Sequence, residues 1–570
     1  MVRFDAPALW DSAVDPESGV TVALAGRVAF DASEWARADK LAYRGGAACK
    51  LLLDAWNRSE SNFGLQVNGA AVVTVFSPRT SELHLFTDRM GVFPVYQSMV
   101  GPTMLCSHPD VLADVMASQG NAPAFDLTTM AECLATGNSV HPYTYHSTIR
   151  QLDAATHYVF STTESNDEVQ KQCFWKPSRA VDSNASAEDL TLELASALRT
   201  AGARRTASIL GTNGLLLSGG ADSRALLFSA PQPDLVESLT FCDTANSESL
   251  VAQQIAAVAG SRHHLLHRSP EHYAEGALET VRITGGMFSL KDAHFQGFMP
   301  SLQKLNLGNL MTGCYTDYLL KGLAYNKTPL KLFGRPLPLD RLTTFSMEYY
   351  QPYSSIHATW RSEVDHRLQD CFPTHDQEQY NIDPDTIADR RVRPLSREAD
   401  AMGRLFLLRT TPWDPVMVEN EILSLYQRIP ANLKLNARVF RAAVTQLVPS
   451  EARKIPNNND FSTLDASEPV RLVRYVLRKF ADRLPGGGQS KFSTKSLGTA
   501  GSWPNFVYFV KHSQVLPMLW CDPSAAQWEL LSDLLGEDPW RRTLAEWADF
   551  DVDLILRLIT LKLWLGLRGV

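Results

Sequence analysis

One short stretch constrains the fold of this chain more than any other. It reads GLLLSGGADSRALLF, from Gly214 to Phe228, and joins an apolar run to a predicted helix through two glycines. We expect a buried strand over Asn213–Leu217 and a helix from Asp222 onward. A strand that ends in Ser-Gly-Gly and restarts as a helix presents bare backbone N–H groups, which bind anions and phosphate most readily. We therefore predict a phosphate site here; the alternative is a tight turn without a ligand.

The segments that follow predict a parallel sheet. Val251, Ile255 and Val258 form the apolar face of a predicted helix that Gly260 ends. Strand and helix alternate, which is typical of a doubly wound α/β sheet, and ligands of such sheets bind at the carboxyl ends of the strands. The phosphate site lies at such an end. The predicted strand, helix and strand cover Asp234–Cys242, Ser247–Ala259 and Arg262–Leu266.

The chain is too long for one ordinary core, because it has 570 residues, so we expect at least two domains. Its first part holds period-two stretches over Val20–Phe30 and Ala70–Asp88, the second with a turn at Ser77–Thr80. The polar stretch Lys176–Glu188 has the composition of a linker, and helical patterns dominate after it. The expected domains are residues 1–178 and 189–570.

Composition excludes several functional classes. The formal net charge of −8 argues against a general nucleic-acid binder. No apolar run has the length of a membrane span, and the start MVRFDAPALW does not read as a signal peptide. The eight cysteines are scattered without a C-x-x-C pair, which fits free thiols in a reducing cytoplasm rather than a zinc site or a disulfide framework.

The predicted phosphate loop differs from the commonest phosphate motifs. No lysine follows its glycines as in a Walker loop, and the third glycine of a dinucleotide fingerprint is missing. A nucleophile elbow needs a glycine where Leu216 stands. What remains is Ser-Gly-Gly-x-Asp-Ser, in which Ser218 and Ser223 add hydroxyl donors. Asp222 would repel a phosphate unless a cation lay between them, which implies Mg²⁺.

This loop, Leu217 to Ser223, resembles the pyrophosphate loop of the N-type ATP pyrophosphatases. Five further segments are similar to the asparagine-synthetase family in the family's order, so the resemblance covers nearly the whole chain. It implies a glutaminase-like (Ntn-type) α/β/β/α sandwich followed by a doubly wound, parallel-sheet ATP-pyrophosphatase domain. The five segments are Phe86–Gln97, Ser238–His264, Leu310–Gly322, Arg409–Pro430 and Lys434–Pro456.

The resemblance also implies a reaction and a set of site residues. In this family a substrate carboxylate attacks the α-phosphate of ATP, pyrophosphate leaves, and an amine displaces AMP from the acyl-adenylate. Asp222 and Asp317 would share Mg²⁺, and Lys454 would be the catalytic lysine that offsets transition-state charge. A turn carboxylate and a solvated lysine are the alternatives for Asp317 and Lys454. The implied nucleotide-binding residues are Leu217, Ser218, Gly219, Gly220, Asp222, Ser223 and Gly313.

Two further segments are candidates for the same site. Glu348 follows Asp317 at roughly the spacing of the acid/base glutamate in the β-lactam-forming branch of the family, although an ordinary surface glutamate has the same pattern. The stretch Pro485–Ser496 is rich in Gly, Ser and Lys. It reads as a solvated connection or as a lid over the phosphate site.

The amino-terminal domain departs from its family pattern. A working glutaminase half uses a cysteine at the mature amino terminus, whose own α-amine serves as the base. This chain starts Met1-Val2, its first cysteine is Cys49 within a predicted helix, and no Asn-Gly-Glu segment for glutamine is found. We therefore interpret residues 1–178 as a degenerate amidotransferase-like domain, and the substrate must supply the amine.

The departures favour one branch of the family. β-Lactam synthetases and lasso-peptide cyclases both join an amine and a carboxylate of one substrate. The β-lactam branch has Tyr where this chain has Cys314, with Tyr315 next, and Arg224 replaces a small residue. These features favour a lasso-peptide cyclase, a macrolactam synthetase whose partners would be a precursor (core) peptide, a leader peptidase and a leader-recognition protein. Such a substrate needs a large, partly apolar pocket, which the segment between Asp317 and Arg409 could line.

Three alternatives stay open. One is a β-lactam synthetase acting on a small amino acid. A second is an asparagine synthetase that uses free ammonia. The third is a non-catalytic binding subunit, against which the presence of Asp222, Asp317 and Lys454 together argues.

Overall fold

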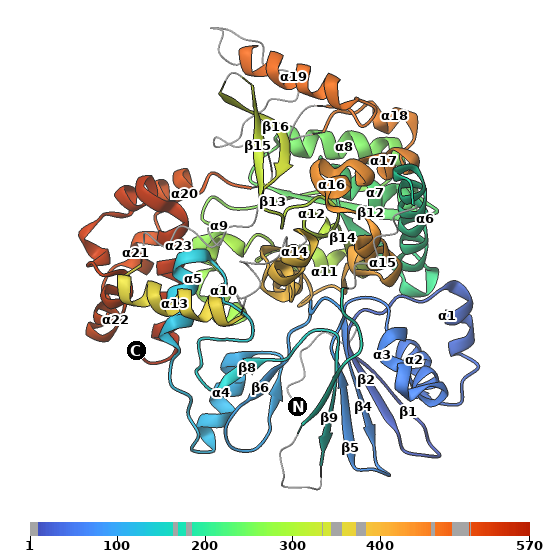
Figure 1. The fold of residues 1–570 in the computed structure, drawn as a ribbon, viewed down its shortest axis with the longest axis horizontal. Helices are drawn as coiled ribbons and strands as arrows, with labels where there is room; N and C mark the ends of the chain where they lie inside the picture. Colours follow the sequence, from blue (N-terminus) through green and yellow to red (C-terminus); the bar gives the residue numbers. More distant parts are fainter. Residues whose placement is uncertain are drawn as a thin grey trace.

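The structure is a computed structural model, shown in Figure 1. Its amino-terminal half, in blue, lies below a larger carboxyl-terminal half that runs from green to orange, and a group of red helices lies at one side. The structure describes residues 10–162, 169–177, 185–332, 334–343, 356–371, 384–457, 462–481, 501 and 503–570.

The amino-terminal half is built on a seven-stranded antiparallel sheet with the order β10-β9-β5-β4-β2-β1-β3. Apolar residues of helix α2 and of strands β2 and β4 share a core on one face. A smaller sheet, β7-β6-β8, carries helix α4. The predicted sandwich of two sheets between helices is confirmed. The strands of the large sheet are β1 (Trp10–Val14), β2 (Thr21–Gly26), β3 (Arg44–Gly45), β4 (Ala71–Ser77), β5 (Glu82–Phe86), β9 (Thr156–Ser161) and β10 (Gln170–Cys173).

Helices α2 and α4 pack on the large and the small sheet, whereas α5 packs on helices of the other half. The small sheet consists of β6 (Tyr96–Ser98), β7 (Leu105–Cys106) and β8 (Ile149–Gln151), and the helices are α1 (Ala32–Ala38), α2 (Ala47–Arg58), α3 (Phe63–Gln66), α4 (Pro109–Ser118) and α5 (Leu127–Thr136). The predicted turn at Ser77–Thr80 joins β4 to β5. The predicted strand over Val20–Phe30 is shorter than expected, because β2 ends at Gly26, whose φ of 110° breaks the extended conformation.

The carboxyl-terminal half is built around a five-stranded parallel sheet with the order β13-β12-β11-β14-β17. The doubly wound sheet is therefore confirmed. Gly260 ends helix α8 at φ 71°, as predicted. Of the three residues on the predicted apolar face of that helix, Val251 and Ile255 are buried, whereas Val258 is 41% exposed. The elements are β11 (Thr212–Leu216), α7 (Ala221–Ser229), β12 (Val236–Cys242), α8 (Ser247–Ala259), β13 (His263–His267), β14 (Leu307–Thr312) and β17 (Trp413–Pro415).

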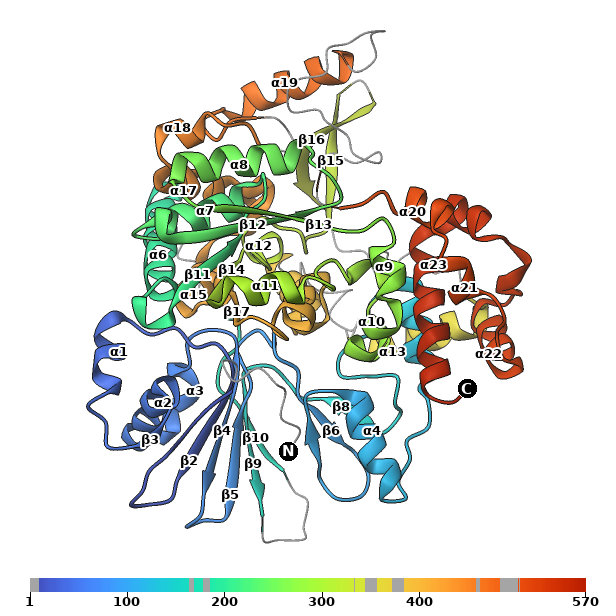
Figure 2. The same ribbon diagram turned by 180° about the vertical axis from the view of Figure 1, so that it is seen from behind.

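A second core joins α5 of the amino-terminal half to the helices at the carboxyl-terminal end. Helix α5 of the amino-terminal half packs against α23 (Leu544–Leu567), the last helix (Figure 1). Figure 2 shows α23 from behind, beside α20 and α21. Arg557 of α23 donates to the carbonyls of Leu134 and Ala135 at the end of α5. The two halves are therefore held together by core packing as well as by loops. Within the described residues, no helix is both long and apolar enough to span a membrane.

Candidate active site

Two neighbouring strands deliver the predicted site residues to one edge of the parallel sheet. Strand β11 leads into the loop at Ser218, and β14 leads through Gly313 into helix α12 (Thr316–Leu320), which carries Asp317. The strand order reverses between β11 and β14, which is where doubly wound sheets bind ligands. The loops approach so closely that a Cβ added to Gly313 would lie 3.1 Å from the Cβ of Asp222. The structure thus brings both predicted segments together.

The loop after β11 has the form of an anion site. Gly220 begins helix α7 without a side-chain cap, which leaves the N–H groups of the first turn facing the loop. The Ser218 N–H donates to Ser223 Oγ across 2.9 Å, and the Gly220 N–H donates to Ser218 Oγ across 3.2 Å. The serine hydroxyls therefore shape the loop itself. Leu217, one of the residues that the resemblance implies for the nucleotide, is buried, and its N–H donates to the Leu239 carbonyl on β12.

A lysine that the sequence analysis missed lies between the two predicted magnesium ligands. Lys321 Nζ is 2.6 Å from Asp222 Oδ2 and 2.9 Å from Asp317 Oδ1. Burial lowers the pKa of the Lys321 ammonium, but the charges of Asp222 and Asp317 outweigh it and raise that pKa overall, so the lysine stays charged. The signal was present in the sequence, because Lys321 follows Asp317 by four residues, a spacing at which opposite charges meet along a helix.

The carboxylate pair fits a magnesium ion that arrives with a nucleotide. Mg²⁺ is usually held by one or two carboxylates together with substrate phosphates. One carboxylate oxygen, Asp222 Oδ1, is buried and has no hydrogen-bond partner in the described part of the chain. The same part contains no group of three or more His, Cys, Asp or Glu side chains placed to hold a metal. The residues present therefore suit a shared protein–phosphate site rather than an all-protein cage.

The segment Leu310–Gly322 resembles the motif Ser/Thr-Gly-x-Gly-x-Asp of the asparagine-synthetase family. Tyr315 occupies the position of the second glycine of that motif. Its φ is 70°, a left-handed conformation that costs a side-chain-bearing residue about 1–2 kcal/mol. Two contacts hold it there: its N–H donates to Asp400 Oδ2 across 2.5 Å, and its buried ring packs 6.5 Å from that of Trp413. The backbone shape of the family motif is therefore present without its glycine.

Two further carboxylates extend the acidic site. Burial raises the pKa of Asp400 to about 6, and the charges of Asp317 and Asp222 raise it as well. Burial raises the pKa of Glu398 to about 8; a hydrogen bond with Tyr318 lowers it, and Asp400 raises it. Glu398 therefore contacts helix α12, which carries Asp317, through the side chain of Tyr318. No sequence signal marks Glu398, whereas the predicted Glu348 lies outside the described residues.

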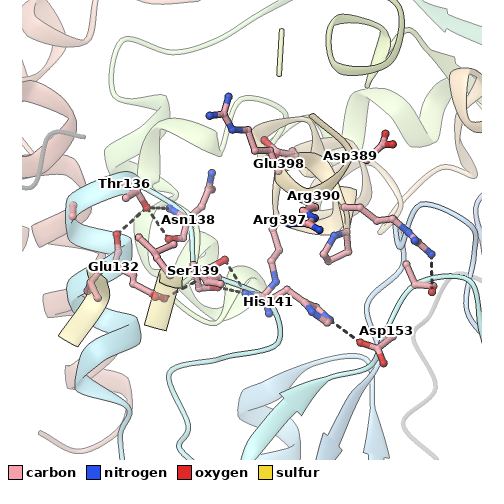
Figure 3. Close-up of a pocket in the computed structure, with 18 of the residues that line it drawn as sticks. Glu132, Thr136, Asn138, Ser139, His141, Asp153, Asp389, Arg390, Arg397 and Glu398 are labelled. Carbon is pink, nitrogen blue, oxygen red and sulfur yellow. Dashed lines mark hydrogen bonds and ion pairs between the residues drawn. The ribbon is translucent and has the colours of Figure 1, made fainter. Parts of the chain in front are cut away.

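A cavity of about 900 Å³ opens beside Glu398, between the two halves of the chain (Figure 3). As expected, the segment between Asp317 and Arg409 lines one wall. The opposite wall comes from the amino-terminal half, which was not predicted, and the lining is charged more than apolar. The residues that form it include Glu132, Thr136, Asn138, Ser139, Val140, His141, Asp153, Asp389, Arg390, Arg393, Arg397, Glu398 and Arg557.

Glu132 is the buried acid of the amino-terminal wall. It lies on α5 and is 1% exposed, and burial raises the pKa of its carboxyl to about 7. Its Oε2 accepts from the Val140 N–H across 3.2 Å, while Oε1 has no partner among the described residues. An unpaired buried acceptor is costly, and it suits a ligand that donates hydrogen bonds.

Lys454, the predicted catalytic lysine, is exposed at the end of α18 (Ser450–Arg453). The described residues show no contact between it and the carboxylate pair, so its role stays a prediction. Its turn is nevertheless fixed to the site, because Arg224 of α7 donates to the carbonyls of Ala452 and Ile455. The loop predicted at Pro485–Ser496 lies outside the described residues.

Two features of the amino-terminal half have structural roles: Asp88, in the family-like segment Phe86–Gln97, and Cys49. Asp88 accepts backbone N–H groups from Met90, Val92 and Phe93. The loop ordered in this way meets the other half, where the Leu395 N–H donates to the Met90 carbonyl. Cys49 lies in helix α2, as predicted, and its side chain is fully buried. Burial raises the pKa of this thiol, which makes it a poor nucleophile.

Family models match both halves of the chain. Residues 31–175 match a glutamine amidotransferase domain, and residues 193–485 match asparagine synthase. The second match covers just over half of the 570 residues. The chain belongs to the asparagine synthase family. Enzymes with an asparagine synthase domain use ATP, usually together with Mg²⁺.

Other comparisons add little to the asparagine synthase assignment. No curated protein matches the chain. One solved structure, titled "Structure of the allosteric regulatory enzyme of purine biosynthesis", is 10% identical with a TM-score of 0.20 and covers 45% of this chain. The match spans 62% of that enzyme, less than two thirds of its length, and at that TM-score it carries no argument. Residues 486–570, including α23, lie outside both family matches.

Proposed function

We propose that this ligase activates a carboxylate of a peptide and closes an amide with an amine of the same molecule, forming a macrolactam as in a lasso peptide. The observation that carries the proposal is the cavity of about 900 Å³ beside Glu398. Cavities of about 300–1,000 Å³ take ligands of drug size, far larger than ammonia or aspartate. A cavity of that volume has room for the part of a peptide that carries the two reacting groups.

The proposed chemistry has two steps. A substrate carboxylate oxygen bonds to the α-phosphorus of ATP, the bond to the β-phosphate oxygen breaks, and pyrophosphate leaves toward the loop Ser218–Ser223. The amine nitrogen then bonds to the acyl carbon, the bond to the AMP oxygen breaks, and the amine proton goes to Glu398. Mg²⁺ bound at Asp222 and Asp317 would offset charge on the phosphates. Holding amine and carboxylate in one cavity makes the second step intramolecular, which contributes several kcal/mol.

The proposed source of the amine is the substrate itself. The first cysteine of the chain, Cys49, is buried in a helix, so it supports no glutamine hydrolysis. A free α-amine on the peptide would come from a separate peptidase that removes a leader. Glu132, with its unpaired oxygen in the cavity wall, is suited to receive an amine or amide donor.

A second candidate is amide formation with ammonia, supplied free or from glutamine. The match of residues 31–175 to a glutamine amidotransferase domain favours it. A β-lactam synthetase-like closure of a small amino acid is a third outcome of the same test.

The test is mass spectrometry of purified protein with ATP, Mg²⁺ and a core peptide that has a free α-amine and an Asp or Glu several residues along. We expect loss of one water from the peptide, release of AMP and pyrophosphate, and resistance of the product to carboxypeptidase. Parallel reactions contain aspartate with ammonia, or aspartate with glutamine. Asparagine in either reaction, with the peptide unchanged, would replace the macrolactam proposal by the second candidate.

A further inference from the structure

Lys321 forms a bridge between two loops of the site. It lies just after helix α12, four residues from Asp317, and reaches across to Asp222 on α7. Its side chain is 23% exposed, so the ammonium sits in a partly desolvated position with an anion on each side. The ring of Phe440, on α17 (Arg438–Leu447), has its centroid 5.6 Å from Lys321 Nζ. These contacts fix the position of the Lys321 ammonium, and its charge offsets the repulsion between the two carboxylates.

The position of the Lys321 ammonium overlaps the position that a divalent cation bound by Asp222 and Asp317 would occupy. Mg²⁺ binds carboxylate oxygens at about 2.0–2.1 Å, so an ion held by both Asp222 and Asp317 would lie between the two side chains, where the Lys321 ammonium now lies. An ammonium and Mg²⁺ between the same two carboxylates repel each other strongly where solvent is partly excluded. Mg²⁺ alone must displace the lysine and leave its charge without a partner. Mg²⁺ that arrives with ATP brings phosphate oxygens, which are new acceptors for the displaced ammonium.

We propose that Lys321 is an internal cation that keeps the Asp222–Asp317 pair closed to free divalent metal until a nucleotide arrives. On Mg²⁺–ATP binding, the ammonium leaves the carboxylates and contacts the phosphates. The proposal rests on the use of ATP and Mg²⁺ by this site but not on the identity of the amide product. It deepens the proposed function by giving the order of binding: nucleotide and metal enter together.

The experiment measures binding of Mn²⁺, an EPR-visible substitute for Mg²⁺, to the full chain without peptide. Lys321→Met is compared with wild type and with Lys327→Met, which removes a lysine of similar exposure that pairs with Asp340 outside the site. Without nucleotide, we expect Lys321→Met to bind Mn²⁺ about tenfold more tightly or better, and Lys327→Met to behave as wild type. With a non-hydrolysable ATP analogue, wild type should bind Mn²⁺ as well as Lys321→Met does.

Two further measurements keep the result interpretable. Thermal unfolding without metal should show Lys321→Met less stable than wild type, because its carboxylates repel, and Mn²⁺ should restore the loss. The double variant Asp222→Asn/Lys321→Met should lose the gained Mn²⁺ site. If Lys321→Met does not fold, Lys321→Gln is used in its place. Equal Mn²⁺ affinity of wild type with and without the ATP analogue would overturn the proposal, whether or not the ligase makes a macrolactam.

Discussion

The guanidinium of Arg224 donates from helix α7 to the backbone carbonyl of Ile455 across 2.8 Å. A second bond, of 3.0 Å, reaches the carbonyl of Ala452. Arg224 is fully buried and lies two residues after Asp222, so the helix of the phosphate loop and the turn that carries Lys454 are fixed to each other. Arg224, which replaces a small residue of the family pattern, therefore positions the turn that carries Lys454.

Replacing Arg224 should loosen that turn. Arg224→Met leaves the carbonyls of Ala452 and Ile455 without their donor, so we expect faster proteolysis near Arg453. If Lys454 acts on the phosphates, ATP–pyrophosphate exchange should also fall about tenfold or more. Arg224→Lys, which retains one donor, should be intermediate. Unchanged proteolysis and exchange in Arg224→Met would contradict this structural role.

Asp222→Ala should abolish ATP–pyrophosphate exchange while the chain stays folded. The change removes one of the two carboxylates suited to Mg²⁺, which is also one of the two partners of Lys321. Asp340→Ala is the matched control, because it removes a carboxylate paired with Lys327 outside the site and should keep near wild-type exchange. Circular dichroism checks the fold. Exchange at a wild-type rate in Asp222→Ala would remove the basis for the site assignment.

Tyr315→Gly sets two effects of opposite sign against each other. Glycine relieves a left-handed strain of about 1–2 kcal/mol, but it deletes a fully buried aromatic side chain, which costs about 3–5 kcal/mol when replaced by alanine. The packing loss is larger, so we expect the variant to be less stable by about 2 kcal/mol in urea unfolding. A variant more stable than wild type would mean that the packing of Tyr315 is worth less than its strain.

Much of the fold could be predicted from the sequence, because its signals are local. The Ser-Gly-Gly turn, the period-two strands and the helix closed by Gly260 each lie within a few residues. Long-range contacts could not be predicted in that way. Glu398 meets Tyr318 only through the fold, and no pattern around it marks a site. The cavity wall around Glu132 depends on how the two halves pack, and Val258 shows that apolar spacing alone does not guarantee burial.

Glutamine should be neither hydrolysed nor required. The thiol of Cys49 is buried and its pKa is raised by burial, so it offers no accessible thiolate. Glutamate release from glutamine is measured with and without ATP, and mass spectrometry defines the amino terminus of the purified protein. Cys49→Ala should leave glutamate release at background. Glutamine hydrolysis above background, or a processed terminus that begins with cysteine, would contradict the prediction.

Glu398 should give the amide-forming step its pH dependence. A carboxylate accepts the amine proton only when ionised, and burial raises the pKa of Glu398 to about 8. The rate of amide formation should therefore rise with pH up to about 8 and level off above it. Glu398→Gln should slow this step and flatten its pH profile, while ATP–pyrophosphate exchange, which needs no base for an amine, should be retained.

The same carboxyl group should also make stability depend on pH. Its pKa is raised in the folded protein from an ordinary value of 4.5 to about 8, so folding favours the protonated form. That favourable contribution is fully present below about pH 4.5 and is lost as the pH rises through about 8. Glu398→Gln cannot ionise, so its Tm relative to wild type should increase between pH 6 and pH 9. Glu451→Gln, at an exposed position, is the control and should show no such trend. If the Tm difference between Glu398→Gln and wild type is the same at both pH values, Glu398 does not titrate as a buried acid, and another group must accept the amine proton.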